Sequence, residues 1–161
     1  MAITKKASNY TLSLNIPTEI KGELRNELLD ELSEYLLSEI IINVEAGHSP
    51  VKGQGDFKKL NAQYAKQQKN GDTTSNLDLH GDMLNALTSE AVGRNKIKVE
   101  IKGEQAIKAY AHNTGFKGHK LLGKKNLRRA FIPNPNELFD KSIMKGLQEL
   151  INEKLDEVKN G

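Results

Sequence analysis

Apolar residues recur along the chain with two different periods, and these periods predict its main elements. Residues 9–16 alternate apolar and polar positions, which is typical of a half-buried strand, and Pro17 ends it. Over 20–44 the apolar residues instead recur at steps of four, which predicts a long amphipathic helix with Gly47 as its C-terminal stop. The second half of this helix, 35–44, is apolar on most sides, so we expect the core or another subunit to bury it.

The rest of the chain also contains apolar residues at helical spacing or in alternation with polar ones, separated by glycine- and proline-rich stretches. In chain order this pattern predicts an exposed loop at 47–56, a helix at 57–69, a short helix leading into a strand over 77–92, a hairpin at 92–101, a helix at 103–113 and a second long helix at 137–158.

This order of elements predicts an α+β fold. We expect a small antiparallel sheet packed against two long helices, with shorter helices and an extended basic loop. A chain of 161 residues is close to the usual size of one domain, so 1–161 is expected to fold as a single unit. Its parts are an N-terminal strand and long acidic helix (1–47), a middle part with the loop, short helices, hairpin and basic loop (48–136), and a C-terminal helix (137–161).

The formal net charge is only +3, but the charges are unevenly distributed. Residues 18–46 contain eight acidic residues against Lys21 and Arg25, whereas 105–136 contain basic groups and no acidic ones. One face is therefore expected to be acidic and another basic. The chain has no cysteine, which excludes disulfides and thiolate metal sites, and its longest apolar run is too short to span a bilayer. We expect a soluble protein made in the cytoplasm.

Catalytic and metal-binding patterns are missing from the sequence. No two of the four histidines have the i, i+4 spacing that places two imidazoles on one helical face. No nucleophile with a base and an orienting group is recognisable, and the glycines of "KGQGD" and "FKGHKLLGKK" lack the frame of a phosphate-binding loop. The sequence thus predicts no enzyme, no catalytic, cofactor or metal residues and no cofactor.

The most distinctive feature is a basic segment at residues 117–129, which we expect to be held out as an exposed loop. It could contact nucleic acid through its cations, remain a solvated surface, or lie against the acidic helix of a neighbouring copy. Its cations are the predicted partner or DNA contacts: Lys117, Lys120, Lys124, Lys125, Arg128 and Arg129.

Four stretches in this order carry a family resemblance: "SPVKGQGDFKKLNAQYAKQQKNG", "NLDLHGDMLNAL", "QAIKAYAHNTG" and "RRAFIP". With the hairpin between the second and third, the chain resembles the virion-morphogenesis, or tail-completion, proteins of tailed bacteriophages. The resemblance covers roughly residues 48–158. The motif elements that match are Ser49 with Pro50, Leu79–Leu84, Tyr110–Gly115 and Arg129–Pro133.

The resemblance implies a structural virion protein of the neck, assembled in the host bacterial cytoplasm. It implies a homo-oligomeric ring of six or twelve copies that joins the portal or adaptor of the head to tail proteins, with non-specific contact to packaged DNA and no membrane. The alternative is a small nucleic-acid-binding module that uses residues 117–129.

Five residues are expected to fix the two ends of the basic segment. Gly115 permits a positive φ where the chain leaves the preceding helix. Phe131 re-enters the core together with its neighbour Ile132, and Pro133 blocks extension of a strand there. His112 and Asn113 either belong to this frame or only cap the end of a helix.

Overall fold

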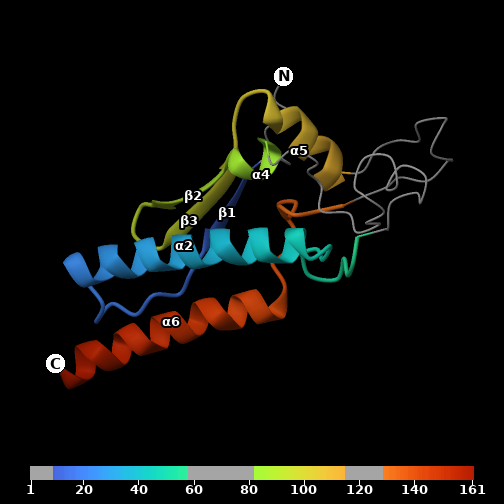
Figure 1. Ribbon diagram of the computed structural model, residues 1–161. Coiled ribbons are helices and arrows are strands. Elements are labelled where there is room, and N and C mark those ends of the chain that lie inside the picture. The colour runs from blue at the N-terminus through green and yellow to red at the C-terminus, as the bar shows by residue number, and fades with distance from the viewer. Residues whose placement is uncertain (1–8, 58–81, 115–128) are drawn as a thin grey trace, which may run out of the picture.

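The structure is a computed structural model, and it describes residues 9–57, 82–114 and 129–161 (Figure 1). These residues form the predicted α+β fold, with a small antiparallel sheet and two long helices. The elements in chain order are β1 (Asn9–Ser13), α2 (Glu23–Glu45), α4 (Asp82–Asn85), β2 (Leu87–Val92), β3 (Lys96–Ile101), α5 (Gln105–Thr114) and α6 (Lys141–Asn160).

The sheet has three strands in the order β1-β3-β2, and both pairings are antiparallel. β2 and β3 form the predicted hairpin, in which Gly93 adopts a φ of 66° that other residues rarely adopt. Tyr10 of β1 lies opposite Val99 of β3, and Leu12 lies opposite Ile97. All four side chains are buried, so the alternation that predicted the strands gives the sheet its apolar inner face.

Helix α2 forms the middle layer, between the sheet and α6 (Figure 1). Because apolar residues at steps of four wind around a helix with 3.6 residues per turn, one stripe can supply contacts to both neighbours. Its most deeply buried residues span the whole helix: Leu28, Leu32, Leu36, Ile40 and Val44 have no exposed surface. This helix is therefore the centre of the core.

The two long helices approach each other closely where Tyr35 of α2 lies over Gly146 of α6. A Cβ atom built on Gly146 would overlap the phenol ring of Tyr35. The sequence offers no other reason for a glycine in the middle of a helix, where it costs about 1 kcal/mol relative to alanine. Gly146 thus leaves room for the ring of Tyr35 between the two helices.

Several element boundaries differ from those the sequence predicts. Helix α6 begins at Lys141, not at 137, because residues 134–137 form a turn and Phe139 pairs with Val51 in an isolated β-bridge. Strand β1 ends at Ser13, before Pro17 is reached. The predicted helix at 57–69 falls, from residue 58 onward, outside the described residues.

Candidate interaction site

A buried junction joins the end of α5 to the segment that precedes α6. The side chain of Asn113 has no exposed surface, and its Oδ1 accepts hydrogen bonds from two backbone N–H groups, those of Phe131 at 2.8 Å and Ile132 at 2.9 Å. Phe131 and Ile132 are themselves fully buried, as expected for their return to the core. One amide oxygen thus satisfies two donors that have no strand partner.

A backbone hydrogen bond joins the same two segments next to the Asn113 side chain. The N–H of Arg129 donates to the carbonyl of His112 at 2.9 Å, in the last turn of α5. The last four carbonyls of a helix lack intrahelical partners, so this bond satisfies one of them from outside. The chain therefore leaves α5 and returns at Arg129 side by side, and residues 115–128 are connected to the fold at both ends by this junction.

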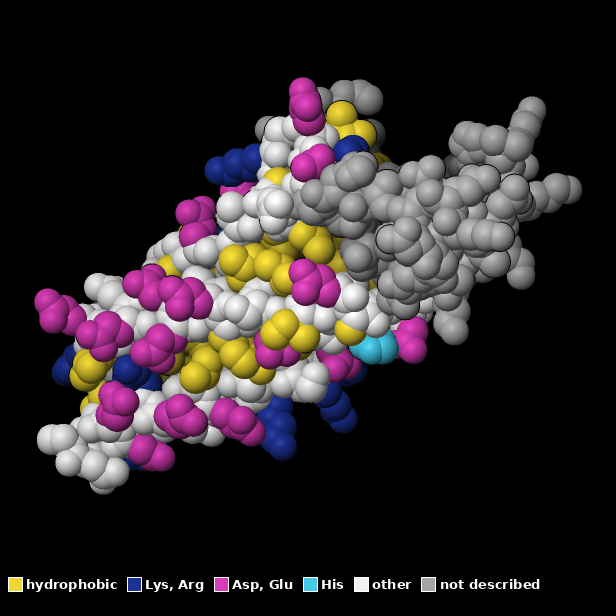
Figure 2. Space-filling model, viewed as in Figure 1, with side chains coloured by type: hydrophobic (Ala, Val, Ile, Leu, Met, Phe, Trp, Pro, Cys, Tyr) yellow, Lys and Arg dark blue, Asp and Glu magenta, His cyan; other side chains and the backbone are white. Residues whose placement is uncertain are grey.

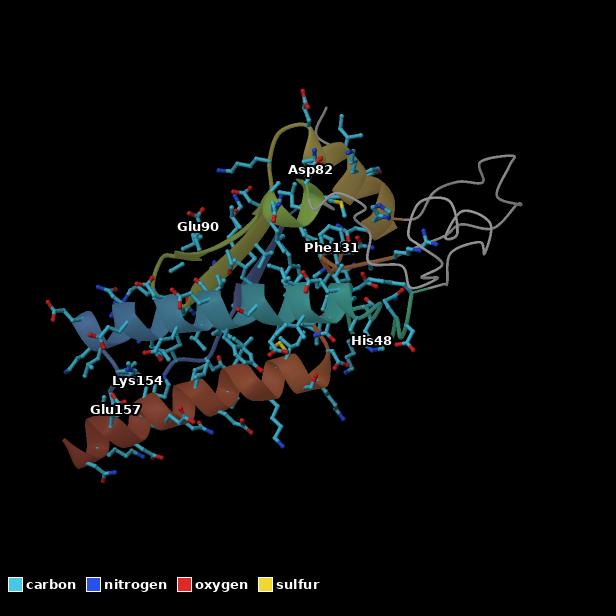
Figure 3. All side chains as sticks on the ribbon, in the orientation of Figure 1. His48, Asp82, Glu90, Phe131, Lys154 and Glu157 are labelled. Atoms are coloured by element: carbon cyan, nitrogen blue, oxygen red, sulfur yellow. The ribbon has the colours of Figure 1, made fainter. Side chains whose placement is uncertain are left out.

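A third segment, directly after α2, completes the junction. The Ser49 hydroxyl donates to the carbonyl of Ala130 at 2.5 Å and accepts from the N–H of Val51 at 3.1 Å. In Figure 3, Phe131 and His48 are both labelled near the C-terminal end of α2, where these segments meet. The sequence treated 47–56 as an exposed loop. That prediction is wrong for Gly47 and for Ser49 to Val51, which are buried, and is confirmed for His48 and for Lys52 to Asp56, which are exposed.

The segment after Ser49 also fixes the approach to α6. The N–H of Lys52 donates to the carbonyl of Leu138 at 2.8 Å, and the N–H of Asp140 donates to the carbonyl of Pro50 at 2.7 Å. This two-residue pairing holds Phe139 in the core, where its ring lies edge-on to that of Tyr10 with centroids 5.4 Å apart.

Tyr10 links the sheet to this pairing. Its hydroxyl donates to the carbonyl of Glu137 at 2.9 Å. Burial raises the pKa of the Tyr10 phenol, because the charged form would lose its hydration. The neutral phenol therefore stays a hydrogen-bond donor over the ordinary pH range.

The structure places the predicted site residues in three different environments. Asn113, Phe131 and Pro133 are buried, and His112 is half-buried. Arg129 is half-buried as well, and its burial lowers the pKa of the guanidinium. It lies at the edge of the junction, and its role as a partner or DNA contact stays a prediction. The remaining predicted site residues lie outside the described residues: Gly115, Lys117, Lys120, Lys124, Lys125 and Arg128.

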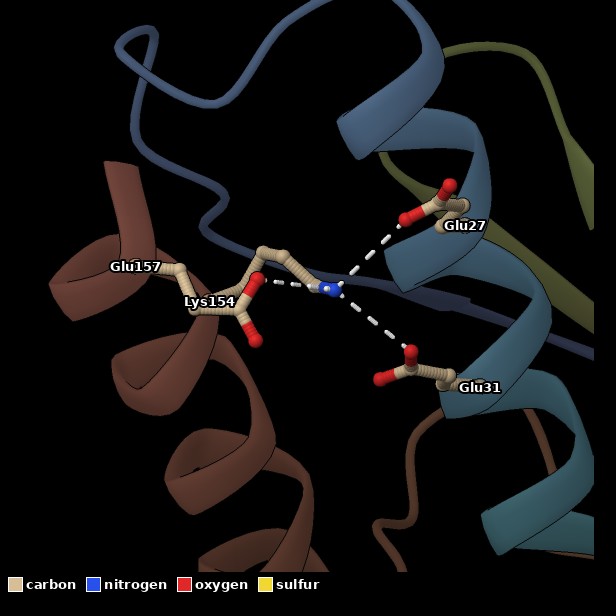
Figure 4. A network of polar contacts seen from close by, with 4 residues as sticks. All are labelled: Glu27, Glu31, Lys154 and Glu157. Atoms are coloured by element: carbon tan, nitrogen blue, oxygen red, sulfur yellow. Dashed lines mark hydrogen bonds and ion pairs between the residues drawn. The ribbon is translucent and has the colours of Figure 1, made fainter. Parts of the chain in front are cut away.

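A second polar cluster, which the sequence did not predict, lies between α2 and α6 (Figure 4). The ammonium of Lys154, almost fully buried, lies 3.4 Å from Glu157, 3.5 Å from Glu31 and 3.8 Å from Glu27. Burial alone would lower the pKa of Lys154, but the negative charges and hydrogen bonds of Glu31 and Glu157 outweigh it and raise the pKa. The one sequence feature that pointed to this cluster is the position of Lys154, a charged residue one turn after Ile151 on the apolar face of α6.

Within 9–57, 82–114 and 129–161, no group of three or more histidine or acidic side chains could hold a metal ion. His48 and Asp56 are in contact across an isolated bridge, but both are exposed at the surface. Among the helices in these ranges, none has the length and apolar character needed to cross a membrane.

Comparisons of the chain with protein-family models, with curated proteins and with solved structures gave no match.

Proposed function

We propose that the chain is a non-enzymatic structural protein of the tailed-phage neck, a tail-completion protein that forms a ring and joins the portal side of the head to the tail. The proposal includes assembly of six or twelve copies, contacts with portal or adaptor and tail proteins, and location in the virion. It starts from the motif order of the sequence, which resembles that protein family.

The observation that supports it is the junction at Asn113. Residues of three of the four motif elements meet there although up to 81 residues separate them: Ser49 with Pro50, Asn113 of Tyr110–Gly115, and Arg129–Pro133. Their polar atoms hold the chain at both ends of residues 115–128. The buried polar network fixes both ends of a cation-rich segment, and a segment held in this way can bind other molecules through its charges.

Reversal of charge in the basic segment tests this function. We expect Lys124→Glu, Lys125→Glu and Arg128→Glu together to block head–tail joining in an infection that depends on the variant, while the far-ultraviolet circular dichroism stays that of the wild type. Arg129 is left unchanged because it is half-buried. The control reverses Lys96 and Lys108, which are exposed on the described body, and should leave joining intact.

The alternative, a nucleic-acid-binding module, makes the opposite prediction. Under that alternative the triple variant abolishes salt-dependent binding of duplex DNA by a stable monomer and leaves joined particles unaffected. Normal yields of joined particles with the triple variant would contradict the proposed function.

A further inference from the structure

Charge is divided between the described body and the rest of the chain. The described residues contain 13 of the 24 basic residues and 19 of the 21 acidic ones, which leaves 11 basic and 2 acidic residues for 1–8, 58–81 and 115–128. The described body is therefore acidic although the whole chain is basic. The stretch 115–128 has no acidic residue and five basic ones: Lys117, Lys120, Lys124, Lys125 and Arg128.

The negative charge of the body is concentrated on one side of α2. Residues of a helix follow one another at 100°, and at that spacing six exposed acidic residues fall within a single solvent-facing arc opposite the buried stripe. In Figure 2, acidic side chains gather over α2 and α6 on the face shown. We call the arc on α2 the acidic face: Glu23, Glu27, Asp30, Glu31, Glu34 and Glu45.

Cations of the described body leave most of this charge unbalanced. Arg25 is the one basic residue of α2, and its guanidinium donates to the backbone carbonyls of Arg94 at 2.7 Å and Ile20 at 2.8 Å. Lys154 is shared among three carboxylates, two of which, Glu27 and Glu31, belong to the acidic face. The acidic face thus retains a surplus of negative charge that a basic partner would neutralise.

Two isoleucines lie on or beside the acidic face in the last turns of α2, before Glu45. Ile42 is 57% exposed and its neighbour Ile41 is half-buried. Residues 115–128 also combine charged and apolar side chains, with Leu121 and Leu122 placed between basic residues. An occupant with both cations and leucines fits this surface better than a nucleic acid backbone, which would bring more negative charge.

Reach favours a second copy over the same chain. Because Arg129 and Ala130 are bound at the junction beside Ser49, a segment of 14 residues fixed there at both ends extends at most about 25 Å from it. Glu27 precedes the last residue of α2 by 18 residues, or about 27 Å along the axis. Within one chain, residues 115–128 can therefore reach Asp30, Glu34 and Glu45 but only approach Glu23 and Glu27 at full extension. A neighbouring copy is not limited in this way and can lie along the whole acidic face.

We propose that the acidic face of one copy binds residues 115–128 of the next copy, head to tail. This inference rests on the proposed function, since it identifies the contact that builds the ring. A heterologous contact of this kind places a different surface of each subunit on either side of the boundary, and it closes into a ring when the rotation allows. Charge then sets the register, and the isoleucines and leucines exclude water.

A charge exchange between two variants tests the contact in solution. The acidic-face variant carries Asp30→Lys and Glu34→Lys, and the basic-segment variant carries Lys124→Glu and Lys125→Glu. Each alone should self-associate at least about tenfold more weakly than the wild type by sedimentation velocity, because like charges then meet. An equimolar mixture of the two should regain oligomers, since each variant offers a surface complementary to the other.

Each matched control makes the same change in net charge as one of the two variants, but at exposed residues outside α2 and outside 115–128. Glu90→Lys with Glu104→Lys, and Lys96→Glu with Lys108→Glu, alter exposed residues outside α2 and should associate like the wild type. Wild-type oligomers should also weaken in about 1 M salt, where the screening length falls to about 3 Å.

Three results would overturn the inference: wild-type association of either variant, a mixture that stays monomeric, or a wild type that remains monomeric at low salt. A single chain that carries all four substitutions should form oligomers as the mixture does. If this chain instead regains the wild-type free energy of unfolding but stays monomeric, the contact lies within one molecule and the inference is also wrong. Failure of the proposed function is read separately, from the absence of the chain in virions.

Discussion

The junction at Asn113 is the strongest local test of the fold, because one side-chain oxygen supports two buried backbone donors. In Asn113→Ala the N–H groups of Phe131 and Ile132 lose their acceptor while both residues remain fully buried. An unsatisfied buried donor costs about 1–3 kcal/mol, so the two together predict a loss of about 2–6 kcal/mol. That is a large part of the 5–15 kcal/mol that is typical of a whole domain.

Urea unfolding followed by circular dichroism measures this loss, and amide hydrogen exchange localises it. We expect slow exchange at Phe131 and Ile132 in the wild type and faster exchange of these two amides in the variant. Asn152→Ala is the matched control, since Asn152 is exposed on α6 and accepts from Gln148, which is exposed as well. It should change the free energy of unfolding by less than about 0.5 kcal/mol. A similarly small change for Asn113→Ala, with both amides still protected, would refute the reasoning.

Two further predictions concern the α2–α6 interface. In Gly146→Ala the ring of Tyr35 has to move, because the new Cβ would overlap its outer atoms. The gain of about 1 kcal/mol in helix propensity should therefore be offset in the wild-type background and recovered in Tyr35→Ala, as a double-mutant cycle of urea unfolding measures; an equal effect in both backgrounds would contradict the contact. Lys154 has a raised pKa, so the stability it contributes is fully present below its ordinary value of 10.5 and is lost as the pH rises through the higher value of the folded protein. Urea titrations from neutral to strongly alkaline pH should therefore show a steeper alkaline decline for the wild type than for Lys154→Met, and parallel curves would exclude this role for Lys154.

The spacing of apolar residues was enough to predict the strands and the central helix. The alternation around Leu12 and Ile97 correctly predicted two strands, and the stripe from Leu28 to Val44 predicted the central helix. Gly47 was correctly predicted to end that helix, and it has a φ of 82°. These signals are local, so tertiary structure did not need to be known.

The errors arose where a distant segment decides the conformation. Phe139 continues the apolar spacing of α6, but the backbone of Pro50 and Lys52 pairs with the chain on either side of it and delays the helix to Lys141. Ser49 looked like part of an exposed loop because its partner, Ala130, lies 81 residues away.

The candidate site was only partly predictable for the same reason. The motif order singled out Asn113 and Phe131, but no local signal showed that the amide oxygen of one would bind the backbone of the other. The partners of Lys154 could not be predicted either, because Glu27 and Glu31 belong to a helix more than 120 residues earlier in the sequence.

The most direct test of the central claim is cryo-electron microscopy of tailed particles that carry this chain. The account predicts a ring of six or twelve copies between the portal and the tail, with residues 115–128 of each copy against α2 of its neighbour. Particles whose neck is complete without this chain would contradict it.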